Sequence, residues 1–107
     1  MLYLSRNEGD AVMIGDCIRV VVSMVSRRRV TVHITRDYGL STATTQISSL
    51  APGKPQHIER DMFVMLRRTG RRGAKLGFKA PINVPVHRQE IYDKIAEAEH
   101  DVTQAAS

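Results

Sequence analysis

The sequence predicts a mainly β protein that ends in one α-helix. Runs of β-branched residues, such as Val30-Thr-Val-His-Ile34, alternate apolar and polar positions as half-buried strands do. Near the C-terminus the period changes, because Ile91, Ile95 and Ala98 recur at helical spacing with charged residues between them. With 107 residues, 42% of them hydrophobic, the chain is long enough for a single domain with a modest core.

The elements follow from local composition. Gly and Asp-rich turns, basic tips and prolines separate the apolar runs. The expected order is a strand at 2–6, a strand at 11–14, a hairpin over 17–34 with a tip at 26–29, a second hairpin over 62–79 with a basic turn at 67–73, a short extended piece at 83–86, a helix over 88–100 and a tail at 101–107.

Residues 35–60 differ from the rest of the chain. Ser, Thr, Gly, Pro and Gln dominate there, and large apolar side chains are sparse. Such a composition buries little, so we expect a flexible polar segment. The segments 16–34 and 61–81 share the order strand, basic tip, strand, which leaves a partial internal duplication open.

Charge indicates the kind of partner. The net charge is +5, and fourteen of the sixteen basic residues precede residue 82, whereas residues 82–107 carry an acidic excess. Most of these bases are arginines, whose planar guanidinium suits phosphates and nucleobases. A nucleic acid is therefore the first candidate partner and an acidic protein the second, with a merely solvated basic face as the simpler interpretation. Two arginine clusters stand out: Arg27, Arg28 and Arg29, and Arg67, Arg68, Arg71 and Arg72.

Several function classes have little support. Cys17 is alone, so no intramolecular disulfide forms, and we expect it to act as a small buried residue. The four histidines share no metal-ligand spacing, and no nucleophile, acid–base pair or phosphate loop is evident. We expect no catalytic residue, metal or cofactor. No run is long enough to span a membrane and no signal peptide is visible, so a cytoplasmic location is expected.

Two segments resemble the carbon storage regulator (CsrA/RsmA) family of RNA-binding translational regulators. The first is MLYLSRNEGDAVMIGDCIRVVV, with its Met-Leu-x-Leu-Ser-Arg opening followed by Gly9 and by Met13-Ile14-Gly15-Asp16. The second is LGFKAPINVPVHRQEIYDKI, with Ala-Pro, Val-His-Arg and Glu-Ile-Tyr at family spacing. The two segments cover about residues 1–34 and 74–98 and stand in the family's order.

The resemblance implies a five-stranded, intertwined homodimer with a C-terminal helix. This chain would add an insertion at 35–73, made of the flexible polar segment and an extra hairpin's strand and turn. Either 30–34 or 74–79 could then be the family's fourth strand. Two further departures concern the site. Asn7 stands where the family usually has a basic residue, and Pro85 requires the last strand to lie at an edge, or to present that position away from its neighbour.

The resemblance also implies an RNA site between the first strand of one subunit and the last strand and helix start of the other, present twice per dimer. Its target would be a GGA-containing loop in the 5′ leader of a messenger RNA, and binding would modulate translation or message stability. Small regulatory RNA and a protein antagonist are further candidate partners. The residues carried over by position are Leu4, Ser5, Arg6, Ala80, Pro81, Val86, His87 and Arg88, with Arg88 as the main charged contact. The two arginine clusters form a secondary basic surface.

Two other functions remain open. A divergent family member could have lost RNA binding and act by heterodimerisation or by protein antagonism. A general polyanion binder would use the arginine tips on RNA and DNA alike, with an affinity that falls steeply with salt.

Overall fold

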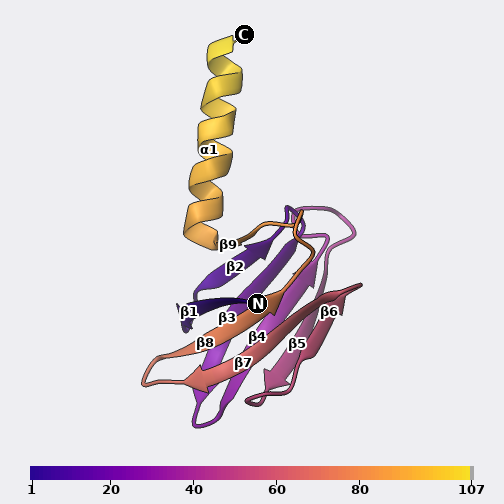
Figure 1. The fold of residues 1–107 in the computed structure, drawn as a ribbon. Coiled ribbons are helices and arrows are strands. Elements are labelled where there is room, and N and C mark those ends of the chain that lie inside the picture. Colours follow the sequence, from indigo (N-terminus) through magenta and orange to yellow (C-terminus); the bar gives the residue numbers. More distant parts are fainter. Residues whose placement is uncertain (107) are drawn as a thin grey trace.

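The computed structural model describes the backbone of residues 1–106 and the side chains of residues 1–98. This part of the chain forms nine strands and one C-terminal helix, which confirms the mainly β prediction (Figure 1). The elements are β1 (Leu2–Asn7), β2 (Ala11–Ile14), β3 (Ile18–Ser26), β4 (Arg29–Arg36), β5 (Thr44–Leu50), β6 (Gln56–Glu59), β7 (Met62–Thr69), β8 (Gly73–Lys79), β9 (Val86–Arg88) and α1 (Gln89–Ala106).

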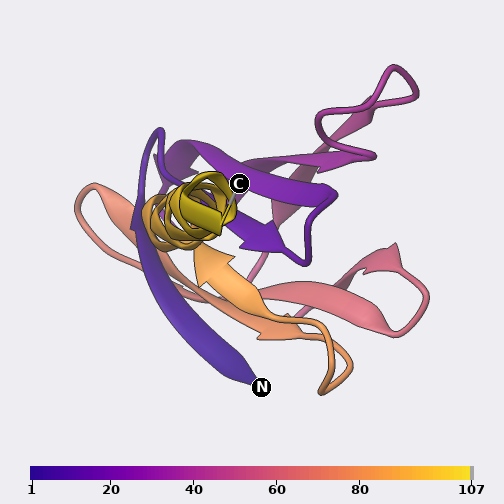
Figure 2. The ribbon, with the colours of Figure 1, turned by 90° about the horizontal axis from the view of Figure 1, so that it is seen from above.

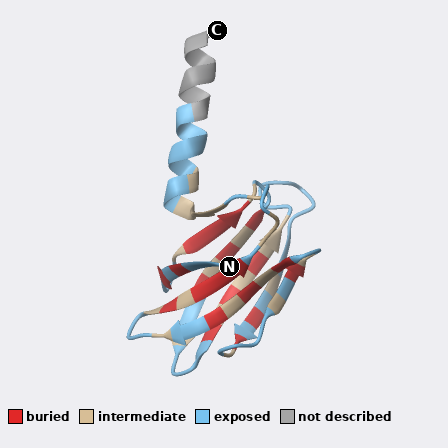
Figure 3. Cartoon of the chain, in the orientation of Figure 1, coloured by how far each residue is buried: buried red, intermediate tan, exposed pale blue. Residues whose placement is uncertain are grey.

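The strands form two antiparallel sheets. Sheet A has the order β1-β8-β7-β6, and sheet B has the order β5-β4-β3-β2-β9. The sheets face each other, and the buried side chains of both form one hydrophobic cluster (Figure 3). Helix α1 begins directly after β9 and projects away from the sheets, so that it is seen end-on in Figure 2.

Alternating side chains build the core. Val20 and Val22 on β3 and Val64 and Leu66 on β7 are at most 1% exposed, while the residues between them are only partly buried. Complete burial of an aliphatic side chain stabilises a fold by about 1.5–3 kcal/mol. The burial of these two strands therefore has the period of two of a strand with one face inside, although the sequence there is an almost continuous apolar run.

The strand pairing shows that most of the chain consists of two equivalent units. The first unit is β1–β4 and the second is β5–β8. Each unit contributes its second, third and fourth strands to one sheet and its first strand to the other sheet: β1 pairs with β8, and β5 pairs with β4. A shift of 44 residues relates the units, since the bulge at Val22/Met24 in β3 corresponds to the bulge at Leu66/Arg68 in β7.

The turns after the two first strands repeat as well. Gly9 has a φ of +90° and donates its N–H to the Val22 carbonyl at 2.7 Å. Gly53, 44 residues later, has a φ of +77° and donates to the Leu66 carbonyl at 3.1 Å. Glycine adopts such left-handed conformations without steric cost. The internal duplication therefore extends beyond the hairpins and includes the first strand of each unit.

The prediction of a flexible polar segment at 35–60 was wrong, because β5 and β6 lie within it. Strand β5 is an edge strand that pairs with β4 along its whole length. Only Ser48 and Leu50 of this strand are buried, so it shows little apolar alternation in the sequence. Strand β6 is anchored by Ile58, which is 2% exposed.

The two candidates for the fourth strand are both strands, β4 and β8, and they occupy equivalent places in the two units. Strand β9 is the edge of sheet B, one of the two arrangements that Pro85 allows, and the Pro85 carbonyl, just before β9, accepts a hydrogen bond from Gly15 N–H at 2.8 Å. Helix α1 continues to Ala106, through most of the stretch predicted as a tail, and residue 107 lies outside the described residues. Cys17 is exposed, which contradicts the prediction that it is buried.

Candidate nucleic-acid interface

Sheet A and the start of the helix meet at an ion pair. The Arg6 guanidinium on β1 donates from Nη1 to Oε1 of Glu90 at 2.8 Å and from Nη2 to Oε2 at 2.9 Å. This two-pronged geometry is the strongest form of arginine–carboxylate contact. Because β1 belongs to sheet A and Glu90 follows β9 of sheet B, the pair connects the edges of both sheets. We call this junction the seam.

Electrostatics at the seam follow from the hydrogen bonds. Those from Arg6 are the main reason that the pKa of Glu90 is lowered to about 2, and a hydrogen bond to the backbone of Glu90 itself acts in the same direction. The hydrogen bond with Glu90 is also the main reason that the pKa of Arg6 is raised. Both groups are therefore charged at neutral pH.

The remaining contacts of Arg6 are internal. Its Nε donates to the Ser5 carbonyl at 2.9 Å, its Nη1 also donates to the Ala11 carbonyl at 3.1 Å, and the residue is only 7% exposed. The sequence placed Arg6 among the RNA contacts. In the structure the N–H groups of its guanidinium donate to other groups of the protein, and these hydrogen bonds fix β1 relative to β2 and the start of α1.

Strand β9 presents its side chains to two sides. Val86 pairs with Ile14, and Arg88 pairs with Val12. Directly paired residues share a face of the sheet, so Val86 and Arg88 are on the side of the buried Ile14 and Val12, which is the side toward sheet A. His87 has the opposite orientation.

His87 lies apart from the other predicted contacts. It lines a hollow together with Asp16, Pro85, Tyr92 and Ile95, between the β2–β3 turn and the first turns of α1. Tyr92 donates to Asp16 at 3.1 Å across this junction. The position of His87 favours a structural role where the last strand joins the helix.

The structure brings Ala80, Pro81 and Val86 together. With Met1, Leu2 and Ile82 among the other residues, they line a hollow of about 250 Å³ beside the start of β1. Leu4 is 8% exposed and belongs to the core, whereas Ser5 is exposed on the outer face of β1. All the residues that line this hollow except Lys79 are apolar, so it offers a surface on which an unstacked base can pack.

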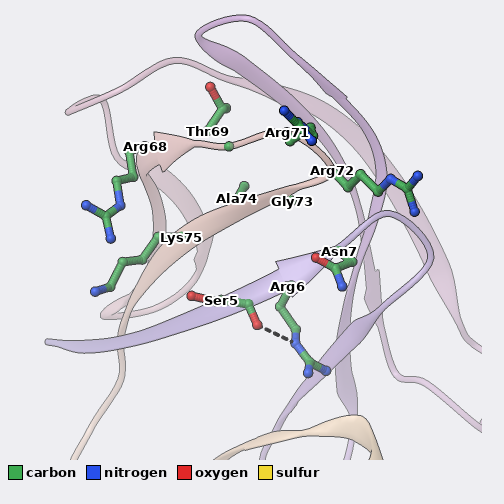
Figure 4. A pocket seen from close by; sticks show the side chains of 11 residues that line it. Ser5, Arg6, Asn7, Arg68, Thr69, Arg71, Arg72, Gly73, Ala74 and Lys75 are labelled. Atoms are coloured by element: carbon green, nitrogen blue, oxygen red, sulfur yellow. Dashed lines mark hydrogen bonds between the residues drawn. The ribbon is translucent and has the colours of Figure 1, made fainter.

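A second, basic hollow of about 280 Å³ lies at the other end of β1. The β7–β8 turn and the neighbouring strand ends form one wall, and β1 forms the opposite wall (Figure 4). The side chains around it are mostly polar and include no carboxylate. The lining residues are Ser5, Arg6, Asn7, Arg68, Thr69, Gly70, Arg71, Arg72, Gly73, Ala74 and Lys75.

The two arginine clusters lie at the same end of the molecule. The backbone N–H of Arg28, in the β3–β4 turn, donates to Oγ1 of Thr69 at the end of β7 at 3.2 Å. The basic turns of both units are thus adjacent, and Arg71 and Arg72 extend the basic surface toward Asn7 and Glu8.

Sequence reasoning missed one aromatic residue of this region. Tyr3 lies on the outer face of β1, two residues before Ser5, and the Arg67 guanidinium lies over its ring at 5.6 Å from the ring centre. Lys75 pairs directly with Ser5 on the same face. The alternation of β1 could have indicated that Tyr3 and Ser5 share a face, but the cross-strand neighbours depend on pairing with β8.

Within the described residues, no cluster of three or more His, Cys, Asp or Glu side chains could hold a metal ion. The same part of the chain has no helix with the length and apolar character needed to cross a bilayer.

Comparison with known proteins agrees with this geometry in part. Residues 1–40 match the model of the CsrA family, described as a global regulator protein family. No curated protein and no solved structure was found to match the chain. The matched residues are β1 to β4, that is, the first unit, including the β1 side of the seam. This similarity supports a CsrA-like RNA-binding regulator and points away from an enzyme family.

Proposed function

We propose that this protein is a sequence-specific messenger RNA-binding regulator that recognises a GGA-containing loop in a 5′ leader and modulates translation or message stability. The observation that carries the proposal is the seam, where β1, from the segment that matches the family, is held against the end of β9 by Arg6 and Glu90. Arg88 stands on β9 two residues before Glu90, on the side that faces sheet A.

The two arginines near the seam have different roles in the proposed site. Arg6 is a positioning residue, because its guanidinium is occupied by Glu90 and by backbone carbonyls. Among the described residues, the Arg88 guanidinium makes no hydrogen bond or salt bridge, so its donors are available for the O6 and N7 atoms of guanine or for a phosphate. The hollow beside Ala80, Pro81 and Val86 would receive a neighbouring base.

The basic hollow at the far end of β1 extends this surface. RNA that leaves the loop along β1 would meet Lys75, Arg68, Arg71 and Arg72, with no carboxylate among the side chains that line this hollow. Contacts to phosphates increase affinity without selecting sequence and make binding more dependent on salt. Specific readout at the seam and general attraction at the basic hollow can therefore be separated experimentally.

The test of specificity is a titration with a GGA hairpin, the same hairpin with the GGA changed, and a duplex DNA of equal length. We expect tighter binding to the GGA hairpin. Arg88→Ala should weaken that binding by about 1–3 kcal/mol, roughly 5- to 150-fold, while the affinity for the altered hairpin changes little. Lys54→Ala, which removes one exposed charge from the β5–β6 turn, is the matched control. Equal affinity for all three nucleic acids would reject the proposal in favour of a general polyanion binder.

The test of the basic hollow is the dependence of affinity on salt. Arg71→Ala combined with Arg72→Ala should reduce the slope of log affinity against log salt concentration by about 1 for each phosphate that these arginines neutralise. The preference for GGA should remain. An unchanged slope would show that these arginines do not bind the RNA.

A further inference from the structure

The resemblance implies a homodimer with two RNA sites, whereas the geometry points to a different assembly. We propose that the protein acts as a single chain that carries one RNA-loop site. This inference rests on the proposed RNA-binding function and specifies how many loops one molecule holds.

The first argument is that the strand exchange closes within one chain. Strand β1 pairs with β8 through six residue pairs, from Leu2 with Phe78 to Asn7 with Gly73. Strand β5 pairs with β4 through seven, from Val30 with Leu50 to Arg36 with Thr44. Both first strands are therefore already paired, each with the other unit, and neither is left to exchange with a second molecule. One chain completes both sheets and their common core.

The second argument is that the seam occurs once among the described residues. The shift of 44 residues places Ser48, Ser49 and Leu50 of β5 where β1 has Leu4, Ser5 and Arg6. Leu50 is 2% exposed and fills the core position that the Arg6 side chain occupies in the first unit. The equivalent edge therefore lacks the guanidinium that holds the seam.

The third argument concerns the closing strand. Strand β9 pairs with the free edge of β2, and the equivalent edge in the second unit is that of β6. In the described part of the chain no strand lies on that edge of β6. Because β9 carries Arg88, the second location lacks a counterpart of Arg88 as well as one of Arg6.

The side chains on the outer faces of the two sheets also favour a single RNA site, on sheet A. Beside β1, sheet A presents Tyr3, Arg67 and Lys75. A shift of 44 residues gives Ile47, Ser23 and Thr31 as their counterparts on sheet B. At these three equivalent positions, the two cations and the aromatic ring therefore occur on sheet A and not on sheet B.

A functional consequence follows from a single site. A regulator with two sites can bind two loops of one transcript, and the second contact then gains from a high effective concentration. A molecule with one site cannot bridge loops in this way. We expect it to select transcripts by one high-affinity loop, with each further loop binding a further protein molecule.

Native mass spectrometry of the full chain, alone and with a GGA hairpin, tests the assembly. We expect a free protein of 12.0 kDa and a complex of one chain with one hairpin. A dimeric free protein, or two hairpins on one chain, would overturn the inference. If no hairpin binds at all, the proposed function itself fails, and the mass of the free protein still reports whether one chain is self-contained.

An RNA with two GGA hairpins tests the consequence for affinity. We expect the first protein molecule to bind it no more than about twofold tighter than an RNA in which one GGA is altered, which is the statistical effect of two equal targets. A second molecule should bind the intact RNA independently. A gain of a hundredfold or more would reveal bridging and contradict a single site. Arg88→Ala should lower the affinity for both RNAs by the same factor.

Discussion

The two units of this molecule share one architecture and differ in what they present. Each has the same strand order, the same bulge in its third strand and the same glycine turn after its first strand. The first unit places Arg6 at the edge of sheet A, where Glu90 meets it, and the second places Leu50 at the corresponding position. The difference teaches that backbone pairing preserves the fold, while a few side chains at one edge determine where a ligand can bind.

The largest expected effect tests whether the two units share one core. Phe78 and Ile34 occupy equivalent positions and are 2% and 0% exposed. Phe78→Ala should lower the free energy of unfolding by about 3–5 kcal/mol and Ile34→Ala by about 2–5 kcal/mol. Because both side chains belong to the same cluster, urea unfolding followed by circular dichroism should show a single transition for each variant. Two separate transitions, each moved by only one substitution, would contradict a common core.

A smaller effect tests how closely β1 must approach β8. A Cβ atom at Gly73 would lie 2.6 Å from the Arg6 carbonyl oxygen, a contact too short to tolerate without movement of the backbone. Gly73→Ala should therefore displace the end of β1 and cost about 1–3 kcal/mol, the usual range for overpacking. Gly70→Ala is the matched control in the same turn, since its nearest neighbour would be at 3.9 Å. Equal stability of the two variants would show that β1 is not packed as described.

The smallest expected effect tests the ion pair of the seam, which the second unit lacks, through the pH dependence of stability. The pKa of Glu90 is lowered in the folded state from 4.5 to about 2, so the unfolded chain takes up this proton first as pH falls. The ion pair therefore contributes its full stabilisation above about pH 4.5 and loses it between pH 4.5 and 2. The midpoint temperature of thermal unfolding should fall between pH 4.5 and 2, and Glu90→Gln should make that fall smaller.

Glu97→Gln provides the control for that measurement, because it removes the same charge from an exposed position of the same helix. The pH dependence of this variant should follow that of the unmodified protein. If Glu90→Gln changes the profile no more than Glu97→Gln does, the seam is not held by its ion pair.

Much of the fold could be predicted, because the central strands must bury one face. Val30 and Val32 flank the polar Thr31, Val20 and Val22 lie in a β-branched run of strand length, and the structure buries all four valines. Strand β5 could not be found in this way, since an edge strand is stabilised mainly by backbone hydrogen bonds and tolerates Thr and Ser on most of its length. The repeat of 44 residues was visible only in the hairpins, where basic tips mark it.

The sequence could indicate which residues lie near one another at the candidate site, but not which protein groups each of them contacts. Ala80, Pro81 and Val86, which the resemblance assigned to the RNA site, line one hollow in the structure. The role of Arg6 depends on Glu90, which is 84 residues away, and no local pattern shows which carboxylate a buried guanidinium will meet. The location of Tyr3 beside Arg67 likewise depends on the pairing of β1 with β8.

A disulfide between β1 and β8 tests most directly whether one chain closes on itself. Ser5 and Lys75 are direct cross-strand partners, and such pairs have a separation that a disulfide can span. In a Cys17→Ser background, Ser5→Cys with Lys75→Cys should oxidise within one chain and run as a monomer on a denaturing, non-reducing gel. A covalent dimer formed at low protein concentration, as the main oxidised product, would show that β1 pairs with the β8 of another molecule and would contradict the account.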